Sequence, residues 1–299
     1  MAAPALARPQ RAAAATAPIA VRRCGAIAHR ALIACGGVTR PVPGFEATPF
    51  RLAGNEIVWV GVDAAMHPRV ALADAGLFEC GTACLDIENA QVHPSETVGG
   101  QGFSSNDARQ SLTRAILRLV QSEKPAGFGH LLAAQALPFP LSHRRDAAVA
   151  LAQACADDDA LAFTTAALRL LGVGSGLTPS GDDFVGAALF ARHAVVTTAA
   201  SGSDAQAVTW SNVRDTILAA AATRTHVISF ALLQDLAHGA SYAALHRFAT
   251  ALNAAHASAM FNAMREIITI GHSSGWDMLT GFIAAVSGTK HLTGTTHIT

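Results

Sequence analysis

The residues best suited to chemistry lie in a glycine-rich segment from Gly172 to Gly186. This segment reads Gly-Val-Gly-Ser-Gly-Leu-Thr-Pro-Ser-Gly-Asp-Asp-Phe-Val-Gly and leads into an alanine-rich helical pattern. Glycines let a backbone approach a ligand closely, and a helix N-terminus offers N–H groups and a dipole that favour anions. We therefore expect a loop that binds a small anion. Its candidate ligand-binding residues are Gly174, Ser175, Gly176, Thr178, Ser180 and Gly181.

Two adjacent carboxylates, Asp182 and Asp183, follow in the first turn of the expected helix, where the helix dipole stabilises them. They would repel a bare phosphate. Either a cation intervenes, or they orient polar N–H groups of a substrate, or one of them only caps the helix. A tight helix–helix loop capped by Ser180 and Asp183 is the simpler alternative. The nucleotide-binding templates do not fit, because no lysine is present and Leu177 replaces the last glycine of the dinucleotide pattern.

A second segment, Gly271–Gly281, reads Gly-His-Ser-Ser-Gly-Trp-Asp-Met-Leu-Thr-Gly after a possible strand at residues 265–270. It contains the G-x-S-x-G pattern of hydrolases, but too few residues follow for the remaining members of a catalytic triad. The two segments share the motif Ser-Gly-x-Asp, at residues 180–183 and 274–277, each followed by a glycine one turn later. Two such helix starts facing each other would enclose one small polar ligand, whereas two independent capping boxes are the alternative.

The second segment and the chain between the two motifs add further candidates. Ser273, Ser274 and Gly275 are expected to bind the ligand, and His272 and Asp277 join Asp182 and Asp183 as catalytic candidates. Arg224, followed by Thr225, has the planar fork that binds a carboxylate or phosphate, although it is equally compatible with an exposed helix-terminal arginine. His226 is a second acid–base candidate, but in a chain with 13 histidines any single one is more often a bystander.

No metal-binding set is predicted. Cys80 and Cys84 have no matching Cys or His pair at the spacing of a zinc site. The sequence identifies no cofactor, and a divalent cation such as Mg²⁺ stays open because of the paired aspartates. A stand-alone metal-dependent hydrolase built on Asp182 and Asp183 is therefore one alternative function.

Composition excludes several classes of partner. The chain of 299 residues has 21 basic and 21 acidic side chains, so no basic field exists to hold a nucleic acid. No apolar run is long enough to cross a membrane. Only 14% of residues are charged, which indicates that part of the surface contacts a partner. The five scattered cysteines favour a reducing compartment, and we expect a cytoplasmic protein.

The fold class we expect is α+β. Residues 1–17 form a disordered tail, 18–105 a small antiparallel β-rich domain, and 106–299 an α-helical domain that carries both glycine-rich segments. β-rich runs occur at 56–62, 70–72 and 84–87. Helical periodicity starts after Asn106, a candidate N-cap, and recurs at 145–156, 159–171, 183–198, 204–222, 227–238, 241–257 and 277–287. Gly172 and Gly239 stand where C-terminal capping glycines belong.

These motifs together resemble one bacterial family. Its pattern matches Gly174–Asp183, Arg224-Thr225, Ile228-Ser229, Leu232-Leu233, Gly239 and Gly271–Asp277, and the resemblance covers about residues 18–290. The named member of the family is a subunit of oxamate carbamoyltransferase, an enzyme of anaerobic allantoin breakdown. The resemblance implies a role in converting oxalurate and phosphate into oxamate and carbamoyl phosphate.

The resemblance also implies partners and leaves alternatives. Two larger protein subunits are expected, and the ligand would be oxamate, carbamoyl phosphate or a similar small anionic amide. Carbamoyl transfer requires alignment of the nitrogen with the carbonyl and stabilisation of the leaving phosphate, without a covalent protein nucleophile. A non-catalytic assembly subunit, in which the glycine-rich segments are interface loops, is the main alternative.

Overall fold

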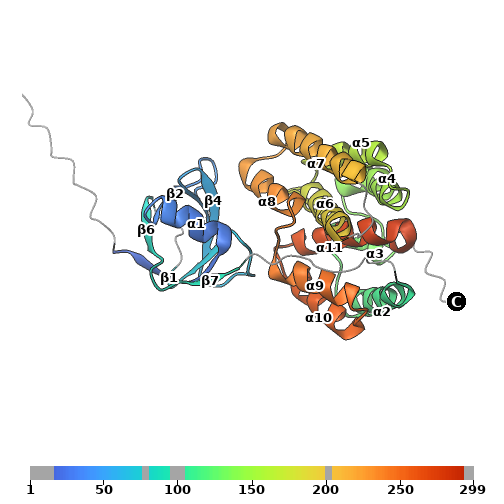
Figure 1. Ribbon diagram of the computed structural model, residues 1–299, viewed down its shortest axis with the longest axis horizontal. Helices are drawn as coiled ribbons and strands as arrows, with labels where there is room; N and C mark the ends of the chain where they lie inside the picture. The colour runs from blue at the N-terminus through green and yellow to red at the C-terminus, as the bar shows by residue number, and fades with distance from the viewer. Residues whose placement is uncertain (1–16, 76–80, 95–104, 199–203, 293–299) are drawn as a thin grey trace, which may run out of the picture.

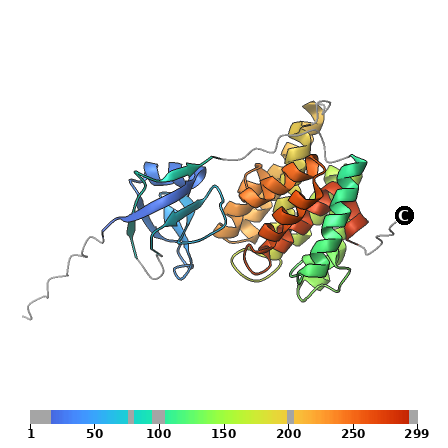
Figure 2. The same cartoon turned by 90° about the horizontal axis from the view of Figure 1, so that it is seen from below.

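A computed structural model describes residues 17–75, 81–94, 105–198 and 204–292. It shows a β-barrel at one end of the molecule and a helical region at the other (Figures 1 and 2). The expected α+β class is therefore confirmed. Most of the expected N-terminal tail, the join between the two regions at residues 95–104, and Cys80 lie outside the described residues.

The barrel is formed by six strands in the order β5-β4-β3-β2-β6-β1, closed by pairing of β1 with β5, and β7 adds to β1. The strands are β1 (Ile19–Gly25), β2 (Val38–Pro41), β3 (Phe50–Ala53), β4 (Glu56–Gly61), β5 (Val70–Ala73), β6 (Ala83–Asp86) and β7 (Gln91–His93). One helix, α1 (Ala26–Ala34), covers the barrel and buries Ala28, Ala31 and Leu32 among inward-facing strand residues.

The three predicted β-rich runs correspond to β4, β5 and β6. The sheet is mixed, however, rather than antiparallel throughout. β1 runs parallel to β6 and β7, and β4 runs parallel to β5, whereas the other described pairs are antiparallel. Parallel pairing needs a crossover connection, which residue periodicity alone does not reveal. The bulge between Val21 and Arg23 lets β1 change partners along its length.

The helical region surrounds two central helices, α6 (Ser180–Thr198) and α11 (Ser274–Ser287), which lie side by side in Figures 1 and 2. They are so close that a Cβ atom at Gly281 would lie 2.1 Å from the Phe184 carbonyl oxygen. The other α-helices of this region are α2 (Asn106–Ser122), α3 (Gly129–Leu132), α4 (Arg145–Ala156), α5 (Ala160–Leu170), α7 (Asp204–Arg224), α8 (Val227–Ala237), α9 (Ala243–Asn253) and α10 (Ala257–Ile268). Two short 3₁₀ helices complete it at Leu141–Arg144 and Gly288–His291.

Most predicted helices are confirmed, with small differences at their ends. Gly172 and Gly239 have φ angles of 73° and 78°, as capping glycines require. Ser105, rather than Asn106, caps α2, because its hydroxyl oxygen accepts from the Ala108 N–H at 3.1 Å. The predicted helix at 241–257 is α9, and residues 265–268 of the possible strand belong to α10.

The barrel is attached to the helical region mainly through α8. Val42, Phe50 and Ile57 of the barrel form one apolar cluster with Ile228, Ala231 and Leu232 of α8. Beside this cluster lies Arg69, the residue before β5. Its buried guanidinium group donates to both carboxylate oxygens of Asp235 on α8, at 2.5 and 2.8 Å. A buried bidentate pair fixes orientation as well as distance. The barrel is therefore held in one position above the starts of α6 and α11.

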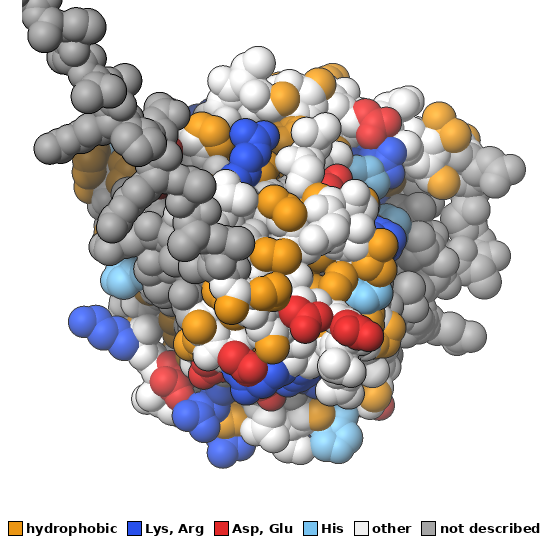
Figure 3. Space-filling model, turned by 90° about the vertical axis from the view of Figure 1, so that its left-hand side faces the viewer, with side chains coloured by type: hydrophobic (Ala, Val, Ile, Leu, Met, Phe, Trp, Pro, Cys, Tyr) orange, Lys and Arg blue, Asp and Glu red, His pale blue; other side chains and the backbone are white. Residues whose placement is uncertain are grey.

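Within the described ranges, no helix is long and apolar enough to cross a membrane. The face at the barrel end carries basic, acidic and apolar side chains in small groups (Figure 3). Among the described residues visible in that view, no extended field of one charge sign occurs.

Candidate functional site

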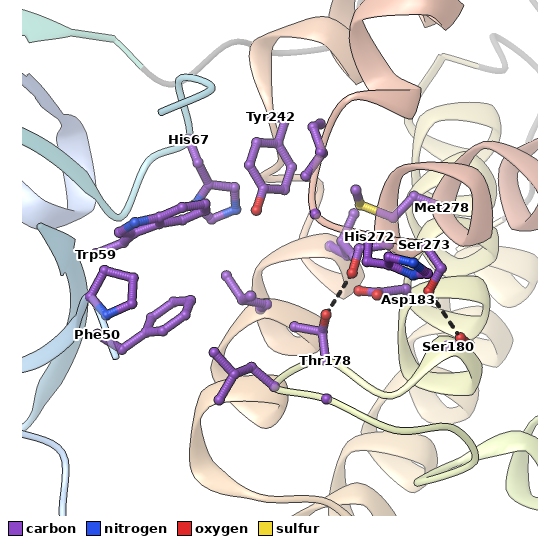
Figure 4. Close-up of a pocket in the computed structure, with 18 of the residues that line it drawn as sticks. Phe50, Trp59, His67, Thr178, Ser180, Asp183, Tyr242, His272, Ser273 and Met278 are labelled. Atoms are coloured by element: carbon purple, nitrogen blue, oxygen red, sulfur yellow. Dashed lines mark hydrogen bonds between the residues drawn. The ribbon is translucent and has the colours of Figure 1, made fainter. Parts of the chain in front are cut away.

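A cavity of about 400 Å³ lies where the barrel meets the starts of α6 and α11 (Figure 4). Its size lies in the usual range of small-molecule sites. The barrel contributes Pro49, Phe50, Trp59 and His67 to the cavity wall. The helical region contributes Ser175, Gly176, Leu177, Thr178, Ser180, Asp183, Leu232, Leu236, Tyr242, Ile270, Gly271, His272, Ser273, Ser274 and Met278.

The two Ser-Gly-x-Asp motifs meet at this cavity. The Thr178 Oγ1 lies 2.7 Å from the Ser274 Oγ, and the Ser180 Oγ lies 3.4 Å from the Ser273 Oγ (Figure 4). Both motifs use glycine for the same reason. A Cβ atom at Gly181 or at Gly275 would lie 1.9 Å from a carbonyl oxygen at the end of the preceding helix. The expected juxtaposition of the two helix starts is therefore present.

Asp183 lies at the helical side of the cavity and is 5% exposed. Its Oδ2 atom has no hydrogen-bond partner among the described residues. Burial raises the pKa of Asp183 well above its usual range, and the nearby Asp277 carboxyl raises it further. The Ser274 and Thr178 hydroxyls lower it, but by less than burial raises it. This raised pKa favours the protonated form of the Asp183 carboxyl group, which can donate one hydrogen bond and accept others.

Asp277 occupies the equivalent position on α11 but lies behind the cavity wall, fully buried. Its Oδ1 accepts from the Phe128 backbone N–H at 2.6 Å, and its Oδ2 has no partner among the described residues. Burial raises the pKa of Asp277 to about 7, against the lowering effects of the Phe128 N–H and of nearby serine hydroxyls. Asp277 thus supports the site from behind rather than facing a ligand.

Asp182 points away from the cavity, toward α8. Its carboxylate accepts from the Gly172 N–H at 2.7 Å, the Thr225 hydroxyl at 2.5 Å and the Ser229 hydroxyl at 2.7 Å. These three bonds join the glycine-rich loop to both ends of the α7–α8 connection. This geometry favours a positioning role for Asp182 over the catalytic role predicted for it, and it assigns Thr225 to the same network rather than to the ligand.

Arg224 is also turned away from the cavity. Its Nη1 donates to the Leu168 carbonyl oxygen at 2.6 Å, near the C-terminus of α5, where a cation is favoured. Of the glycines predicted to bind the ligand, Gly176 lines the cavity, whereas Gly174, Gly181 and Gly275 shape the loops behind it. The structure thus brings together about half of the predicted site residues and places the rest in supporting positions.

The helix starts are less open to an anion than the sequence suggests. The Gly181 N–H donates to the Val173 carbonyl at 2.8 Å, and the Gly275 N–H donates to the Ile270 carbonyl at 2.9 Å. Among the residues that line the cavity, as far as they are described, none is a lysine or an arginine. The cavity therefore offers hydroxyl groups, His272 and a neutral acid, and these groups suit an amide or a protonated acid better than a phosphate dianion.

The cavity residues that were not predicted as site residues include the four aromatic side chains Phe50, Trp59, His67 and Tyr242. His67 and Tyr242 are buried with ring centroids 4.7 Å apart. Burial lowers the pKa of His67 to about 3, so its ring is neutral. Its Nδ1 accepts from the Arg69 N–H at 3.1 Å, which leaves the proton on Nε2. Burial also raises the pKa of Tyr242, so its hydroxyl stays protonated.

A metal centre has little support in this part of the chain. Within the described ranges, no group of three or more His, Cys, Asp or Glu side chains could hold an ion. The two adjacent aspartates face different elements, and the three donors to Asp182 occupy its carboxylate. The donor set therefore does not fit a metal site built on Asp182 and Asp183.

The fold and the site define an α+β protein with a ligand-sized cavity between a β-barrel and two paired helix starts. Residues 170–286, which include both Ser-Gly-x-Asp motifs, match the family model for the oxamate carbamoyltransferase subunit AllH. This match confirms the predicted family resemblance over those residues, and the name of the family implies further subunits. Comparison with curated proteins and comparison with solved structures gave no match.

The positioning role of Asp182 predicts a large loss of stability on its removal. We expect Asp182→Ala to lower the free energy of unfolding by about 3 kcal/mol, because one buried and two partly buried donors lose their acceptor. Asp182→Asn, which keeps one acceptor oxygen, should lose less. Urea unfolding followed by circular dichroism measures both. Wild-type stability of Asp182→Ala would contradict the role.

The buried Asp277 predicts a pH dependence of stability. Its pKa rises from 3.8 to about 7 on folding, so the native state keeps a proton that the unfolded state releases. The proton retained on Asp277 adds on the order of 4 kcal/mol to the free energy of unfolding. This stabilisation is complete below about pH 4 and is lost as the pH rises through about 7. Asp277→Asn removes this loss and keeps an acceptor for the Phe128 N–H. Its stability relative to wild type should therefore be higher at about pH 7.5 than at about pH 5.

Urea unfolding at the two pH values measures this difference. Asp86→Asn is the matched control, because that exposed carboxylate also accepts a backbone N–H, from Glu88 at 3.0 Å. An equal stability difference at both pH values for Asp277→Asn would show that Asp277 is ionised in the folded protein.

Proposed function

We propose that this protein is a subunit of a carbamoyl-transferring enzyme and that its cavity binds the small amide or acid substrate. One observation carries the proposal. The neutral carboxyl group of Asp183, with an unpartnered Oδ2, faces a cavity formed by both motifs of the family-matched segment. Strongly perturbed acids in a cavity are typical of functional sites.

A neutral carboxyl group is the natural partner of a carbamoyl group. The O–H of Asp183 donates to the carbonyl oxygen of H₂N–C=O, and the second carboxyl oxygen accepts from the amide N–H. An ionised carboxylate offers no donor to that carbonyl. Hydrogen bonds to the carbonyl oxygen strengthen as negative charge develops on it in the transition state. The Thr178 and Ser274 hydroxyls, 2.7 Å apart, stand beside this pair.

The reaction proposed is transfer of a carbamoyl group between an amide nitrogen and phosphate, either the reversible conversion of oxalurate and phosphate into oxamate and carbamoyl phosphate or the same reaction of a related amide. For the oxalurate case the bonds change as follows. A phosphate oxygen bonds to the carbamoyl carbon, the C–N bond to the oxamate nitrogen breaks, and that nitrogen takes up a proton. His272, on the loop before α11 at the cavity wall, is the candidate proton donor. Ser175, Ser180 and Ser273 are the candidate donors to the carboxylate of the substrate.

The cations that phosphate requires are expected from another subunit. The described cavity residues include no lysine or arginine, and Arg224 is engaged at the end of α5. The proposed partners are therefore two larger subunits, of which one supplies the phosphate site, with or without a divalent cation. This arrangement is also consistent with a chain in which only 14% of residues are charged.

A non-catalytic assembly subunit is the alternative that one observation favours. Residues 175–178 and 271–273 line the cavity, and Ser175, Gly176, Gly271 and His272 are exposed, so that a partner chain can contact them. Under this alternative, substitutions at Asp183 would release the partners. The metal-dependent hydrolase is not supported by the donor geometry of Asp182 and Asp183.

Substitution of Asp183 distinguishes these functions in the assembled complex. The tagged chain is purified from its native host, and co-eluting proteins and carbamoyl transfer are both measured. Asp183→Ala should lower kcat/KM by at least about 100-fold, the loss typical of one transition-state hydrogen bond donor, while the partners still co-elute. Asp183→Asn, which keeps a neutral donor and acceptor, should lose less.

Asp107→Ala is the matched control, because Asp107 is also a first-turn helix carboxylate but is exposed on α2. Full activity of Asp183→Ala would overturn the proposed site. Loss of the partners with Asp183→Ala, but not with Asp107→Ala, would favour the assembly function instead.

A further inference from the structure

The barrel contributes two neighbouring aromatic rings to the cavity wall, next to the neutral ring of His67. Trp59 is half-buried at this wall, and Phe50 lies beside it with a ring-centroid separation of 5.4 Å. Figure 4 shows both rings facing the cavity from the barrel, with Asp183 at the opposite side. Leu232 and Leu236 of α8 extend this wall. An aromatic ring of a ligand finds here the offset or edge-on contacts that aromatic pairs prefer.

The volume of the cavity exceeds what a small amide fills. At the roughly 30 Å³ that a water molecule occupies in the liquid, a molecule of the size of oxamate fills at most about 180 Å³. The cavity measures about 400 Å³. The remaining space lies along the apolar wall, because the hydroxyl groups and Asp183 gather on the other side.

The polarity of that space argues against a second, highly charged substrate within it. A phosphate dianion beside Trp59, Phe50 and Leu232 would lose its hydration without gaining a cation, since the described wall contains neither lysine nor arginine. A flat uncharged group loses little hydration there and gains contact with two rings.

We propose that the cavity selects an amide with a planar aromatic or heterocyclic body, bound with its carbamoyl end at Asp183 and its ring against Trp59 and Phe50. This inference rests on the proposed function for the role of Asp183, and it adds that the preferred substrate is larger and less charged than oxamate. Trp59 is then a specificity-determining residue contributed by the barrel.

Three probe molecules separate the two ends of the cavity. Benzamide carries the amide and a ring, acetamide carries the amide alone, and oxamate carries the amide and a carboxylate. Calorimetric titration of the full chain should show benzamide binding at least about ten-fold more tightly than acetamide or oxamate, the contribution of one aromatic contact. Trp59→Ala should abolish this preference, and Trp59→Phe, which keeps a ring and protects the fold, should retain part of it.

Val62→Ala is the matched control, because Val62 is a half-exposed residue just beyond β4 and does not line the cavity. Equal affinities for benzamide and acetamide, with no effect of Trp59→Phe, would overturn the proposed selectivity for an aromatic ring. If Asp183→Ala lowered both of those affinities, the proposed function would still hold. Absence of binding by all three amides would overturn both. Tighter binding of oxamate than of benzamide would restrict the site to small anionic amides and contradict the inference.

Discussion

Two carboxyl groups are buried where the first turns of α6 and α11 meet, and the remainder of the site depends on this burial. Removing a charged carboxylate from water costs several kcal/mol when no cation balances it. Near Asp183 and Asp277 the balancing groups are hydroxyls and one backbone N–H, not cations. Burial therefore favours the protonated form of both carboxyl groups, and protonation removes the repulsion that two carboxylates would exert on an anion. A protonated carboxyl group at the cavity wall can donate a hydrogen bond, which a carboxylate cannot do.

Helix α8 connects the barrel to this site. Its first turn holds Asp182 through Ser229, its middle contributes Leu232 to the cavity wall, and its last turn binds Arg69 of the barrel through Asp235. One rigid helix thus joins the glycine-rich loop to the aromatic wall. Because packed interiors deform little, the distance between Asp183 and Trp59 is set by this helix rather than by either loop.

The sequence predicted the parts of the site that are local. The Ser-Gly-x-Asp repetition predicted that two helix starts face each other, and the family resemblance followed from the same residues and is confirmed over 170–286. Helix periodicity and capping glycines likewise predicted most helices, because these signals act within a few residues. The hydrogen bonds of Asp182 could not be predicted, since only the fold shows that Thr225 and Ser229 reach its carboxylate.

The barrel wall could not be predicted for a different reason. Phe50 and Trp59 lie more than a hundred residues from the motifs, in strands whose pattern indicates only that one face is buried, and His67 lies in the loop before β5. The pattern does not distinguish a residue that packs inside the barrel from a residue that packs against α8. The buried ion pair between Arg69 and Asp235 could not be predicted from the sequence either, because arginine and aspartate are residue types that usually lie on the protein surface.

The protonation state of Asp183 is the central claim, and carbon-13 chemical shifts of the aspartate carboxyl groups measure it directly. The full chain is labelled and titrated, and the Asp183 signal is identified as the one missing from Asp183→Asn. We predict that this carbon keeps the shift of a protonated carboxyl well above the pH at which exposed aspartates lose their proton. A midpoint at the ordinary aspartate value would show a carboxylate at the cavity and would contradict the account.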